Sequence, residues 1–310
     1  MWFSNTKTFQ YKDLPNLEGK VILITGGTSG LGKQSAIELA KKNATVIITA
    51  RNEEKGKIAV NEILTKINHQ NSKVSFGVMD QSHLSSVKSF VKWFLDLNLS
   101  LDVLMLNAGI AMVPHQSIDG LESQFYVNHM SHFLLVKLLL EKIKQTPASR
   151  VIFVSSEAYK GVKETPDWDI LAKKQYGEDF NGSFDQYGVS KLANIQTANA
   201  LSRRLINHDV YVNTIHPGAV QTHLADKSSF ASGFFGGIML SLIFLGLSSV
   251  DSGALTQCYV AGHPDIVEHQ YKGCYFIPTA LKQTPNDIAL DQVSQEKLWE
   301  FSEKFVASYL

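Results

Sequence analysis

Patterns typical of buried strands and of helices alternate along this chain from residue 20 onward, and this alternation limits the fold more than any other feature. Residues 20–25 (KVILIT) form an uninterrupted apolar run, as expected for a strand covered on both faces of a parallel sheet. Further strands are predicted at 44–50, 73–79, 102–106, 150–155, 210–215 and 274–277. Helical patterns lie at 31–42, 52–68, 82–97, 121–143 and 185–207. The repeated strand–helix units predict an α/β, doubly wound Rossmann-type domain with a mostly parallel seven-stranded sheet.

Length and composition limit the classes of function. The 310 residues suffice for one α/β domain, which we place at 19–310 behind an N-terminal tail at 1–18 that lacks the apolar core of a secretory signal. The 29 basic and 29 acidic residues give a formal net charge of +0, so no nucleic-acid partner is expected. Cys258 and Cys274 lack the spacing of a disulfide framework or a zinc site, which favours a reducing, cytoplasmic location.

A glycine-rich stretch after the first strand predicts a dinucleotide site. Residues 25–32 read TGGTSGLG and open directly into a helix. Glycine permits a tight turn and a close approach to a pyrophosphate, whose charge the helix N-terminus stabilises. The spacing G-x-x-x-G-x-G differs from the commoner G-x-G-x-x-G fingerprint, but its position on the first strand–helix unit favours cofactor binding.

The end of the second strand bears on the choice of dinucleotide. An acidic residue there binds the ribose 2′-hydroxyl of NAD, whereas an arginine accommodates the 2′-phosphate of NADP. Residues 49–52 (TARN) contain Arg51 and no acid, so NADP(H) is favoured over NAD(H), with Lys33 or Lys55 assisting. A solvated surface charge is the alternative reading of Arg51.

Polar and small residues follow the later strands. Asp80 is placed to accept a hydrogen bond from the adenine amino group, or to cap the following helix. The turn 107–109 (NAG) lies where the backbone would pass the adenosine ribose. Residues 216–218 (HPG), with Thr222 beyond them, form either a rigid turn that faces the nicotinamide carboxamide or an ordinary strand-ending turn.

Tyr187 and Lys191, four residues apart in QYGVSKL, lie on one face of a helix. A phenol has a free pKa of about 10, and an ammonium within about 4–6 Å favours the phenolate, so the pair suits general acid–base chemistry. Tyr-x-x-x-Lys is a common spacing, and an exposed i,i+4 pair is the alternative reading. Ser155 and Ser156 close the fifth strand, where a hydroxyl donates to a substrate carbonyl oxygen or caps the next segment.

Three polar residues interrupt the apolar helix at 121–143. Asn128 is unfavourable there without a partner, so it either holds a water chain or satisfies a bent helix. His129 and His132 are three residues apart, but no carboxylate or third ligand joins them in sequence, and no metal site is predicted.

Together these motifs resemble those of the short-chain dehydrogenase/reductase family. TGGTSGLG, Asp80, NAG, Asn128, the Ser-Ser pair, YGVSK and HPG stand in that family's order, from about residue 17 to the C-terminus. VNHMSHFLL, Arg51 and KLWEFSEKF at 297–305 resemble the branch of the retinol dehydrogenases and the WW-domain-containing oxidoreductase.

The resemblance implies roles for individual residues. Tyr187 would be the general acid/base, Lys191 would lower its pKa and bind the nicotinamide ribose, and Ser156 would hold the substrate oxygen. Asn128, the fourth residue of the implied catalytic set, would anchor a water through which protons reach Lys191. The implied cofactor-binding residues are Gly26, Thr28, Ser29, Gly30, Leu31, Gly32, Arg51, Asp80, Asn107, Ala108, Gly109, Tyr187, Lys191, Pro217, Gly218, Val220 and Thr222.

Two segments extend the family pattern. The insert 157–184, between Ser156 and Tyr187, is longer than in many members, and a short helix is expected near 169–174. The family's substrate lid falls at about 223–250 and contains an uncharged stretch at 230–247. A membrane span there is disfavoured, because the strands on either side belong to one sheet; a lid or core segment, or a lid that also dips into a membrane, stays open.

The sequence therefore predicts an NADP(H)-dependent oxidoreductase that acts on the carbonyl or alcohol of a hydrophobic substrate such as a retinoid, steroid or lipid aldehyde or ketone. The alternatives are reduction of a C=C bond, dehydrogenation of a sugar nucleotide, or a catalytically silent NADP(H)-binding sensor or scaffold. Helices 121–143 and 185–207 leave a homodimer open, and 230–247 leaves open a peripheral contact with the cytosolic face of a membrane.

Overall fold

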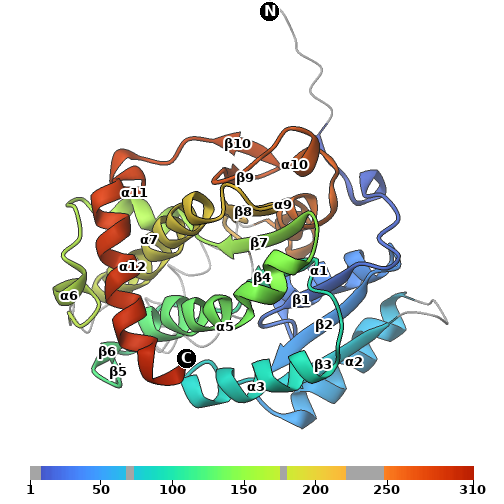
Figure 1. Cartoon of the computed structure of the whole chain (residues 1–310), viewed down its shortest axis with the longest axis horizontal. Helices are drawn as coiled ribbons and strands as arrows, with labels where there is room; N and C mark the ends of the chain where they lie inside the picture. The colour runs from blue at the N-terminus through green and yellow to red at the C-terminus, as the bar shows by residue number, and fades with distance from the viewer. Residues whose placement is uncertain (1–7, 68–72, 175–179, 221–247) are drawn as a thin grey trace, which may run out of the picture.

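An eight-stranded sheet forms the centre of the molecule (Figure 1). The computed structural model describes residues 8–67, 73–174, 180–220 and 248–310. The strands are β1 (Val21–Ile24), β2 (Thr45–Ala50), β3 (Val74–Val78), β4 (Val103–Leu106), β7 (Ser149–Val154), β8 (Val210–Ile215), β9 (Tyr275–Ile277) and β10 (Leu281–Gln283). They lie in the order β10-β9-β8-β7-β4-β1-β2-β3, and every pair is parallel except β9 with β10. The predicted mostly parallel α/β fold is confirmed.

The sheet has one strand more than the seven predicted. The additional strand, β10, has only three residues, which are all exposed, and it pairs antiparallel with β9 at the edge of the sheet. An exposed strand of this length produces no apolar run, so the sequence pattern gave no sign of it. A separate two-stranded ribbon consists of β5 (Ser117–Ile118) and β6 (Leu121–Glu122), so the helix predicted to begin at residue 121 begins at Ser123 instead.

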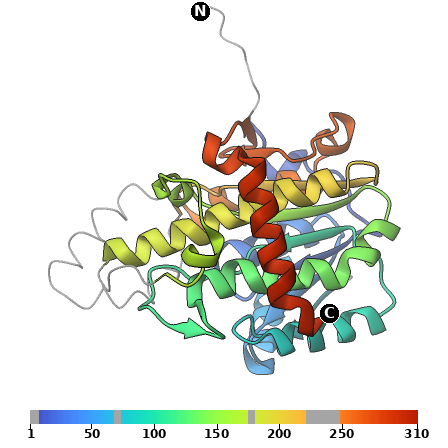
Figure 2. The same ribbon diagram turned by 60° about the vertical axis from the view of Figure 1, so that its left-hand side comes forward.

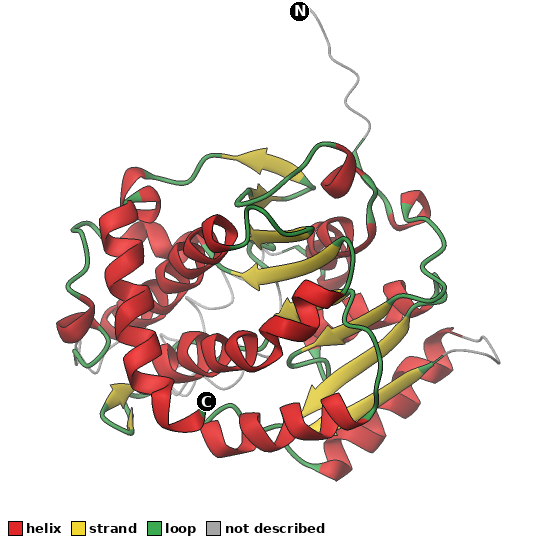
Figure 3. Ribbon diagram, viewed as in Figure 1, coloured by secondary structure: helices red, strands yellow, loops and turns green. Residues whose placement is uncertain are grey.

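Helices cover both faces of the sheet (Figure 3). One apolar core lies under α1 (Gly30–Ala40), α2 (Glu53–Ile67) and α9 (Val250–Gly262). The other lies under α3 (Leu84–Asp96), α5 (Ser131–Gln145), α7 (Phe180–Arg204) and α12 (Gln292–Val306). Side chains of β1 alternate between the cores, Val21 and Leu23 entering one and Ile22 and Ile24 the other. This alternation explains why the strand is apolar throughout.

Short helical segments connect these elements. They are η1 (Tyr11–Asp13), α4 (Ser123–Phe125), the π-helical turn η2 (Tyr126–Met130), η3 (Glu157–Gly161), α6 (Trp168–Leu171), α10 (Asp265–Glu268), α11 (Asp287–Leu290) and η5 (Ala307–Tyr309). The long helix predicted at 121–143 is thus three consecutive segments, α4, η2 and α5, with a π-turn in the middle.

Part of the predicted N-terminal tail packs onto the domain. Phe9, Leu14 and Leu17 are buried. The Phe9 ring packs edge-on against Tyr259 of α9, with 5.2 Å between ring centroids. Residues 8–18 therefore cover apolar surface of α9 and contribute to the core.

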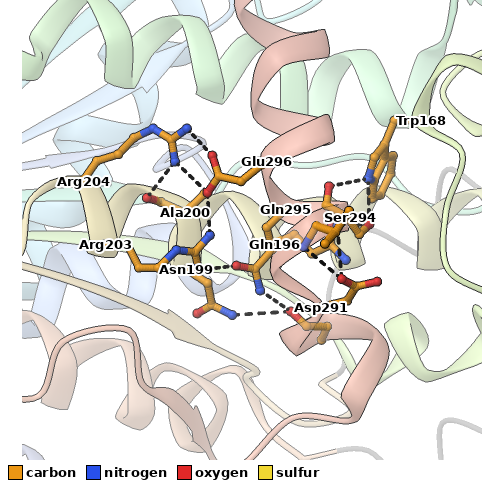
Figure 4. Close-up of polar contacts among 12 residues, drawn as sticks. Trp168, Gln196, Asn199, Ala200, Arg203, Arg204, Asp291, Ser294, Gln295 and Glu296 are labelled. Carbon is orange, nitrogen blue, oxygen red and sulfur yellow. Dashed lines mark hydrogen bonds and ion pairs between the residues drawn. The ribbon is translucent and has the colours of Figure 1, made fainter.

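The indole group of Trp168 anchors the insert between Ser156 and Tyr187 to α12. The short helix expected near 169–174 lies at Trp168–Leu171. Trp168 is buried, and its Nε1 donates to Ser294 of α12, 3.2 Å from the carbonyl and 3.1 Å from Oγ (Figure 4). The Ser294 hydroxyl in turn donates to Oε1 of Gln196 on α7, at 3.0 Å. The insert, α12 and α7 thus share one buried polar network.

The C-terminal helix α12 crosses the outer side of α5 and α7 (Figure 2). The Arg204 guanidinium of α7 lies 4.2 Å from the Trp299 ring centroid and also pairs with Glu296 (Figure 4). Lys137 of α5 pairs with Glu303 at 2.6 Å. A homodimer through α5 and α7 stays a prediction. Because α12 crosses the outer side of both helices, a second copy would have to contact α5 and α7 beside α12.

Most of the predicted lid lies outside the described residues. This applies to the apolar stretch 230–247, to most of 223–250 and to Thr222. In the part of the chain that the structure describes, no helix combines the length and apolar character that a membrane span needs.

Candidate active site

The predicted site residues gather at one edge of the sheet. The glycine turn follows β1, NAG follows β4, the two serines follow β7 and HPG follows β8. These four strands are neighbours and parallel, so their carboxyl ends meet at the same edge. This is the edge at which open α/β sheets bind ligands.

The glycine turn leaves no room for side chains. Gly26 and Gly30 have φ of +67° and +54°, a region that glycine adopts without strain. A Cβ at Gly32 would lie 2.5 Å from Nδ2 of Asn107 and 2.6 Å from the carbonyl oxygen of Gly26. Ser29, the N-cap of α1, makes no side-chain cap hydrogen bond to the helix. The helix therefore presents backbone donors beside a tight turn, a set that fits a pyrophosphate.

Thr25 fixes the NAG loop to the end of β1. Its Oγ1 accepts hydrogen bonds from the backbone amides of Asn107 and Ala108, at 2.9 and 3.0 Å. Asn107 Nδ2 donates back to the Thr25 carbonyl at 2.9 Å, and Asn107 Oδ1 accepts from Gln257 of α9 at 3.2 Å. Thr25 begins the glycine motif but was not among the predicted site residues. Gln257 had no local signal, because it lies 150 residues from its partner.

Val220 and Leu31, two of the predicted cofactor residues, lie close together. A Cβ at Gly253 of α9 would lie 2.5 Å from Val220 Cγ2 and 2.9 Å from Leu31 Cδ2. The chain after β8, which includes Pro217 and Gly218, therefore passes beside the N-terminus of α1.

Arg51 and Asp80 lie past the ends of β2 and β3, whereas Lys33 lies on α1. Arg51 directly follows β2 and is exposed. Lys33 is engaged in an ion pair with Glu62 at 2.7 Å. Asp80 accepts hydrogen bonds from the Ser82 amide and hydroxyl, at 2.9 and 2.7 Å. Its capping interaction with the turn before α3 is therefore present, and its side chain is half-exposed.

Hydrogen bonds set the ionisation of Asp80. Partial burial raises the pKa of its carboxyl group, but the two hydrogen bonds from Ser82, together with the positive charges of His83 and Arg51, shift it downward overall. Asp80 is therefore a carboxylate at neutral pH, as an acceptor for an amino group must be.

Tyr187, Lys191 and Ser156 lie together at the end of β7. The Lys191 ammonium lies 5.4 Å from the Tyr187 ring centroid and donates to the carbonyl oxygen of Val154 at 3.0 Å. Ser156 caps η3, accepting from the Ala158 amide at 3.2 Å, and a Cβ at Gly188, next to Tyr187, would lie 2.6 Å from the Ala158 carbonyl oxygen. The capping interaction and the position beside the phenol thus occur together at Ser156.

The two neighbouring serines have different surroundings. Ser155 is buried, and its hydroxyl donates to the Lys191 carbonyl at 2.8 Å, which ties β7 to α7. Ser156 is half-buried, and its hydroxyl caps η3.

The pKa of Tyr187 differs from the lowering expected from Lys191. Burial raises the pKa of Tyr187 to about 12, and the hydrogen bond with Ser156 offsets only part of this rise. Burial also lowers the pKa of Lys191 to about 8. Desolvation of the phenol is a larger effect in this site than the nearby positive charge. At neutral pH the phenol is therefore protonated and can donate.

Asn128 lies in the π-turn η2, and its side chain forms hydrogen bonds with the loop after NAG. Its Oδ1 accepts from the Ile110 amide and its Nδ2 donates to the Ile110 carbonyl, both at 2.8 Å. Nδ2 also donates to the Ser190 hydroxyl on α7 at 3.0 Å. A Cβ at Gly109, in this loop, would lie 3.0 Å from Asn128 Oδ1 and 3.5 Å from Lys191 Nζ. The Asn128 side chain thus holds the loop beside the ammonium, and its role toward a water chain stays a prediction.

The two histidines of this region face different elements. His129 Nε2 lies 3.0 Å from the Ser302 hydroxyl of α12. His132 contacts Thr25, Gln81 and the Asn128 carbonyl. In the described parts of the chain, no group of three or more His, Cys, Asp and Glu side chains is arranged to hold a metal ion.

The fold and the edge site define a dinucleotide-binding α/β protein, and comparisons with known proteins give its family. The family model described as short chain dehydrogenase matches residues 20–167. Short-chain dehydrogenase TIC 32 A, chloroplastic, from Brassica napus is 37% identical over 92% of this chain and 88% of its own. Retinol dehydrogenase 13 from Homo sapiens is 34% identical over 94% of this chain and 85% of its own. The chain belongs to the short-chain dehydrogenase/reductase family and is an oxidoreductase of the kind that uses NAD(P)(H). The resemblance to that family and to its retinol dehydrogenases is confirmed.

Solved structures agree with the fold. A protein from Mycobacterium paratuberculosis superposes with a TM-score of 0.73 at 28% identity, covering 97% of this chain and 98% of that one. A short chain dehydrogenase from Shigella flexneri 2a, complexed with NADP, superposes with a TM-score of 0.63 at 19% identity, covering 85% of this chain and 98% of that one.

Proposed function

We propose that this protein is an NADP(H)-dependent oxidoreductase for the carbonyl or alcohol group of a hydrophobic substrate, with Tyr187 as general acid/base. The observation that carries the proposal is the position of the Lys191 ammonium, 5.4 Å from the Tyr187 ring centroid at the carboxyl end of β7, where Ser156 also lies. Two hydroxyl groups converge on one point, where a substrate oxygen can accept from both.

The chain's own residues move and stabilise the proton. Tyr187, protonated at neutral pH, donates its proton to the carbonyl oxygen during reduction, and Ser156 donates a hydrogen bond to the same oxygen. The ammonium of Lys191 stabilises the phenolate that is left, and it can also hydrogen-bond a ribose. When bound, the dinucleotide supplies the hydride that the carbonyl carbon receives, or accepts it in the reverse direction.

The residues for the dinucleotide are those of the glycine turn and the strand ends. Gly26, Gly30 and Gly32 leave the backbone open to a pyrophosphate, and the N-terminus of α1 stabilises its charge. Arg51 favours a 2′-phosphate and hence NADP(H). A protein of the same fold was solved with NADP, which agrees with this choice.

Replacing Arg51 by alanine should raise KM for NADPH about tenfold and leave KM for NADH nearly unchanged, because a charge-assisted contact of this kind contributes at least about 1.4 kcal/mol. Initial rates with each cofactor measure the change. Lys57→Ala is the matched control, since Lys57 is an exposed cation on α2 that pairs with Glu53. Equal changes in KM for both cofactors would rule out recognition of the 2′-phosphate by Arg51.

The pH dependence of kcat/KM should follow the ionisation of Lys191. Its pKa is lowered to about 8, so the ammonium is present below that pH and is lost as the pH rises through it. Tyr187, with a pKa of about 12, stays protonated over the same range. We therefore expect kcat/KM for NADPH-dependent reduction to fall as the pH increases above about 8. A profile that rises or stays flat through this window would show that the ammonium is not needed.

The substrate class follows from the relatives and from the sequence. The similarity to proteins named retinol dehydrogenases and the uncharged stretch 230–247 both favour an apolar substrate. Purified protein should oxidise NADPH with at least one member of a panel of retinal, long-chain aldehydes and steroid ketones. Tight NADPH binding without turnover of any member would favour the sensor or scaffold. A cytoplasmic location and a membrane contact through 230–247 stay predictions; the relative TIC 32 A is described as chloroplastic.

A further inference from the structure

Hydrogen bonds around His132 connect the cofactor side of the site to its catalytic side. His132 lies on α5, just after the π-turn, and is 1% exposed. Its Nδ1 lies 3.0 Å from the main-chain carbonyl of Asn128 and its Nε2 lies 2.9 Å from Oγ1 of Thr25. We propose that His132 is a positioning residue that links the end of β1 to the π-turn and so fixes the loop 107–110 beside Lys191.

The partners determine the direction of each hydrogen bond. A carbonyl oxygen only accepts, so the hydrogen of the neutral imidazole is on Nδ1, toward Asn128. The Thr25 oxygen already accepts from the amides of Asn107 and Ala108, so its own hydrogen is available to Nε2 of His132 at 2.9 Å. Its other acceptor, the Met105 carbonyl, lies farther away, at 3.4 Å. The bonds therefore run in one direction, from the NAG amides through Thr25 and His132 to Asn128, and each polarises the next.

A third element holds the imidazole in this state. Nε2 of Gln81, from the turn after β3, lies 2.9 Å from Nε2 of His132 and 3.2 Å from the carbonyl oxygen of Val127. Nε2 of Gln81 also donates to Oγ of Ser131 at 3.0 Å, and it shares the single lone pair of His132 Nε2 with the Thr25 hydroxyl. Burial, with a contribution from Lys191, lowers the pKa of His132 to about 3, so the ring stays neutral over the physiological range.

The linked groups form a closed circuit around the loop. Thr25 holds the loop at Asn107 and Ala108, and Asn128 holds it at Ile110. His132 closes the circuit between Thr25 and Asn128. Because Gly109 in this loop lies next to Lys191, a displacement of the π-turn would move the loop against the ammonium. His132 therefore acts on the reaction through Asn128 and the loop.

Two substitutions of His132 test its Nδ1 donor and its Nε2 acceptor separately. His132→Asn keeps a donor for the Asn128 carbonyl and removes the acceptor for Thr25, so it should raise Kd for NADPH about tenfold and change kcat less than about twofold. His132→Gln keeps a polar atom near Thr25 and removes the donor to Asn128, so it should lower kcat about tenfold and leave Kd for NADPH within about twofold. The kcat arm rests on the proposed function, whereas NADPH binding is measured without a substrate.

His129→Gln is the matched control. His129 is equally buried in the π-turn and its pKa is also lowered to about 3 by burial, but it contacts α12. This variant should lower Tm and leave kcat and Kd unchanged per folded molecule. The proposal is overturned if the two His132 variants change kcat and Kd in the same proportion, following Tm as His129→Gln does.

The tautomer gives a test that needs no variant. Nitrogen-15 NMR of the wild-type protein should show His132 neutral, with hydrogen on Nδ1, from pH 6 to 8. A hydrogen on Nε2, or a protonated ring, would overturn the direction of the bonds and the proposal with it. If the wild type reduces no carbonyl, the proposed function fails, while the NADPH affinities and the tautomer still decide the role of His132.

Discussion

Replacing Tyr187 by phenylalanine should lower kcat for carbonyl reduction by about 10²–10⁴-fold, the usual contribution of a general acid. The variant keeps the ring and loses only the hydroxyl that we propose donates the proton. Because the Lys191 ammonium is held by the carbonyl oxygen of Val154, the rest of the site should keep its shape. Single-turnover and steady-state rates measure the loss, and Kd for NADPH should stay within about twofold.

Tyr159→Phe is the matched control for this prediction. Tyr159 is a buried tyrosine on η3, and its hydroxyl accepts from the Asn286 amide at 3.4 Å. Loss of that hydroxyl should reduce stability by about 1 kcal/mol and leave kcat per folded molecule unchanged. Normal turnover by Tyr187→Phe would show that another group donates the proton.

Replacing Gly32 by alanine should weaken NADPH binding by about 100-fold or more. The added Cβ would lie 2.5 Å from Asn107 Nδ2 and 2.6 Å from the carbonyl oxygen of Gly26, so the turn has to open. Overpacking of this kind costs about 1–3 kcal/mol, or about 5–150-fold in affinity, and the lost backbone contacts to the pyrophosphate add to it. Fluorescence titration with NADPH measures Kd directly.

Gly161→Ala serves as the control for Gly32→Ala. A Cβ at Gly161 would meet only Asp185 Oδ1, at an ordinary 3.9 Å. This variant should bind NADPH like the wild type. Unchanged affinity in Gly32→Ala would mean that the glycine turn does not contact the dinucleotide.

The fold was predictable because its strands are buried on both faces. Each central strand forms an apolar run, and parallel connections bring the carboxyl ends of β1, β4, β7 and β8 to one edge. Motifs that are far apart in sequence therefore lie together at the carboxyl edge of the sheet, as the strand–helix pattern predicted. β10 escaped prediction because its three residues are all exposed.

The supporting contacts of the site were not predictable from local patterns. Gln81 and His132 are 51 residues apart, and Trp168 and Ser294 are 126 apart, so no local spacing signals either contact. The role of His132 depends on the π-turn, which moves Asn128 and His132 off the regular helical register. The raised pKa of Tyr187 depends on the burial of its hydroxyl group, which the sequence does not reveal for a single helical residue.

The central claim is that one substrate oxygen is held by Tyr187 and Ser156 together. The most direct test is a crystal structure of the protein with NADPH and a lipophilic carbonyl compound that it reduces. We predict that the carbonyl oxygen lies within about 2.6–3.2 Å of both Tyr187 Oη and Ser156 Oγ. A carbonyl oxygen bound away from both hydroxyl groups would contradict the account.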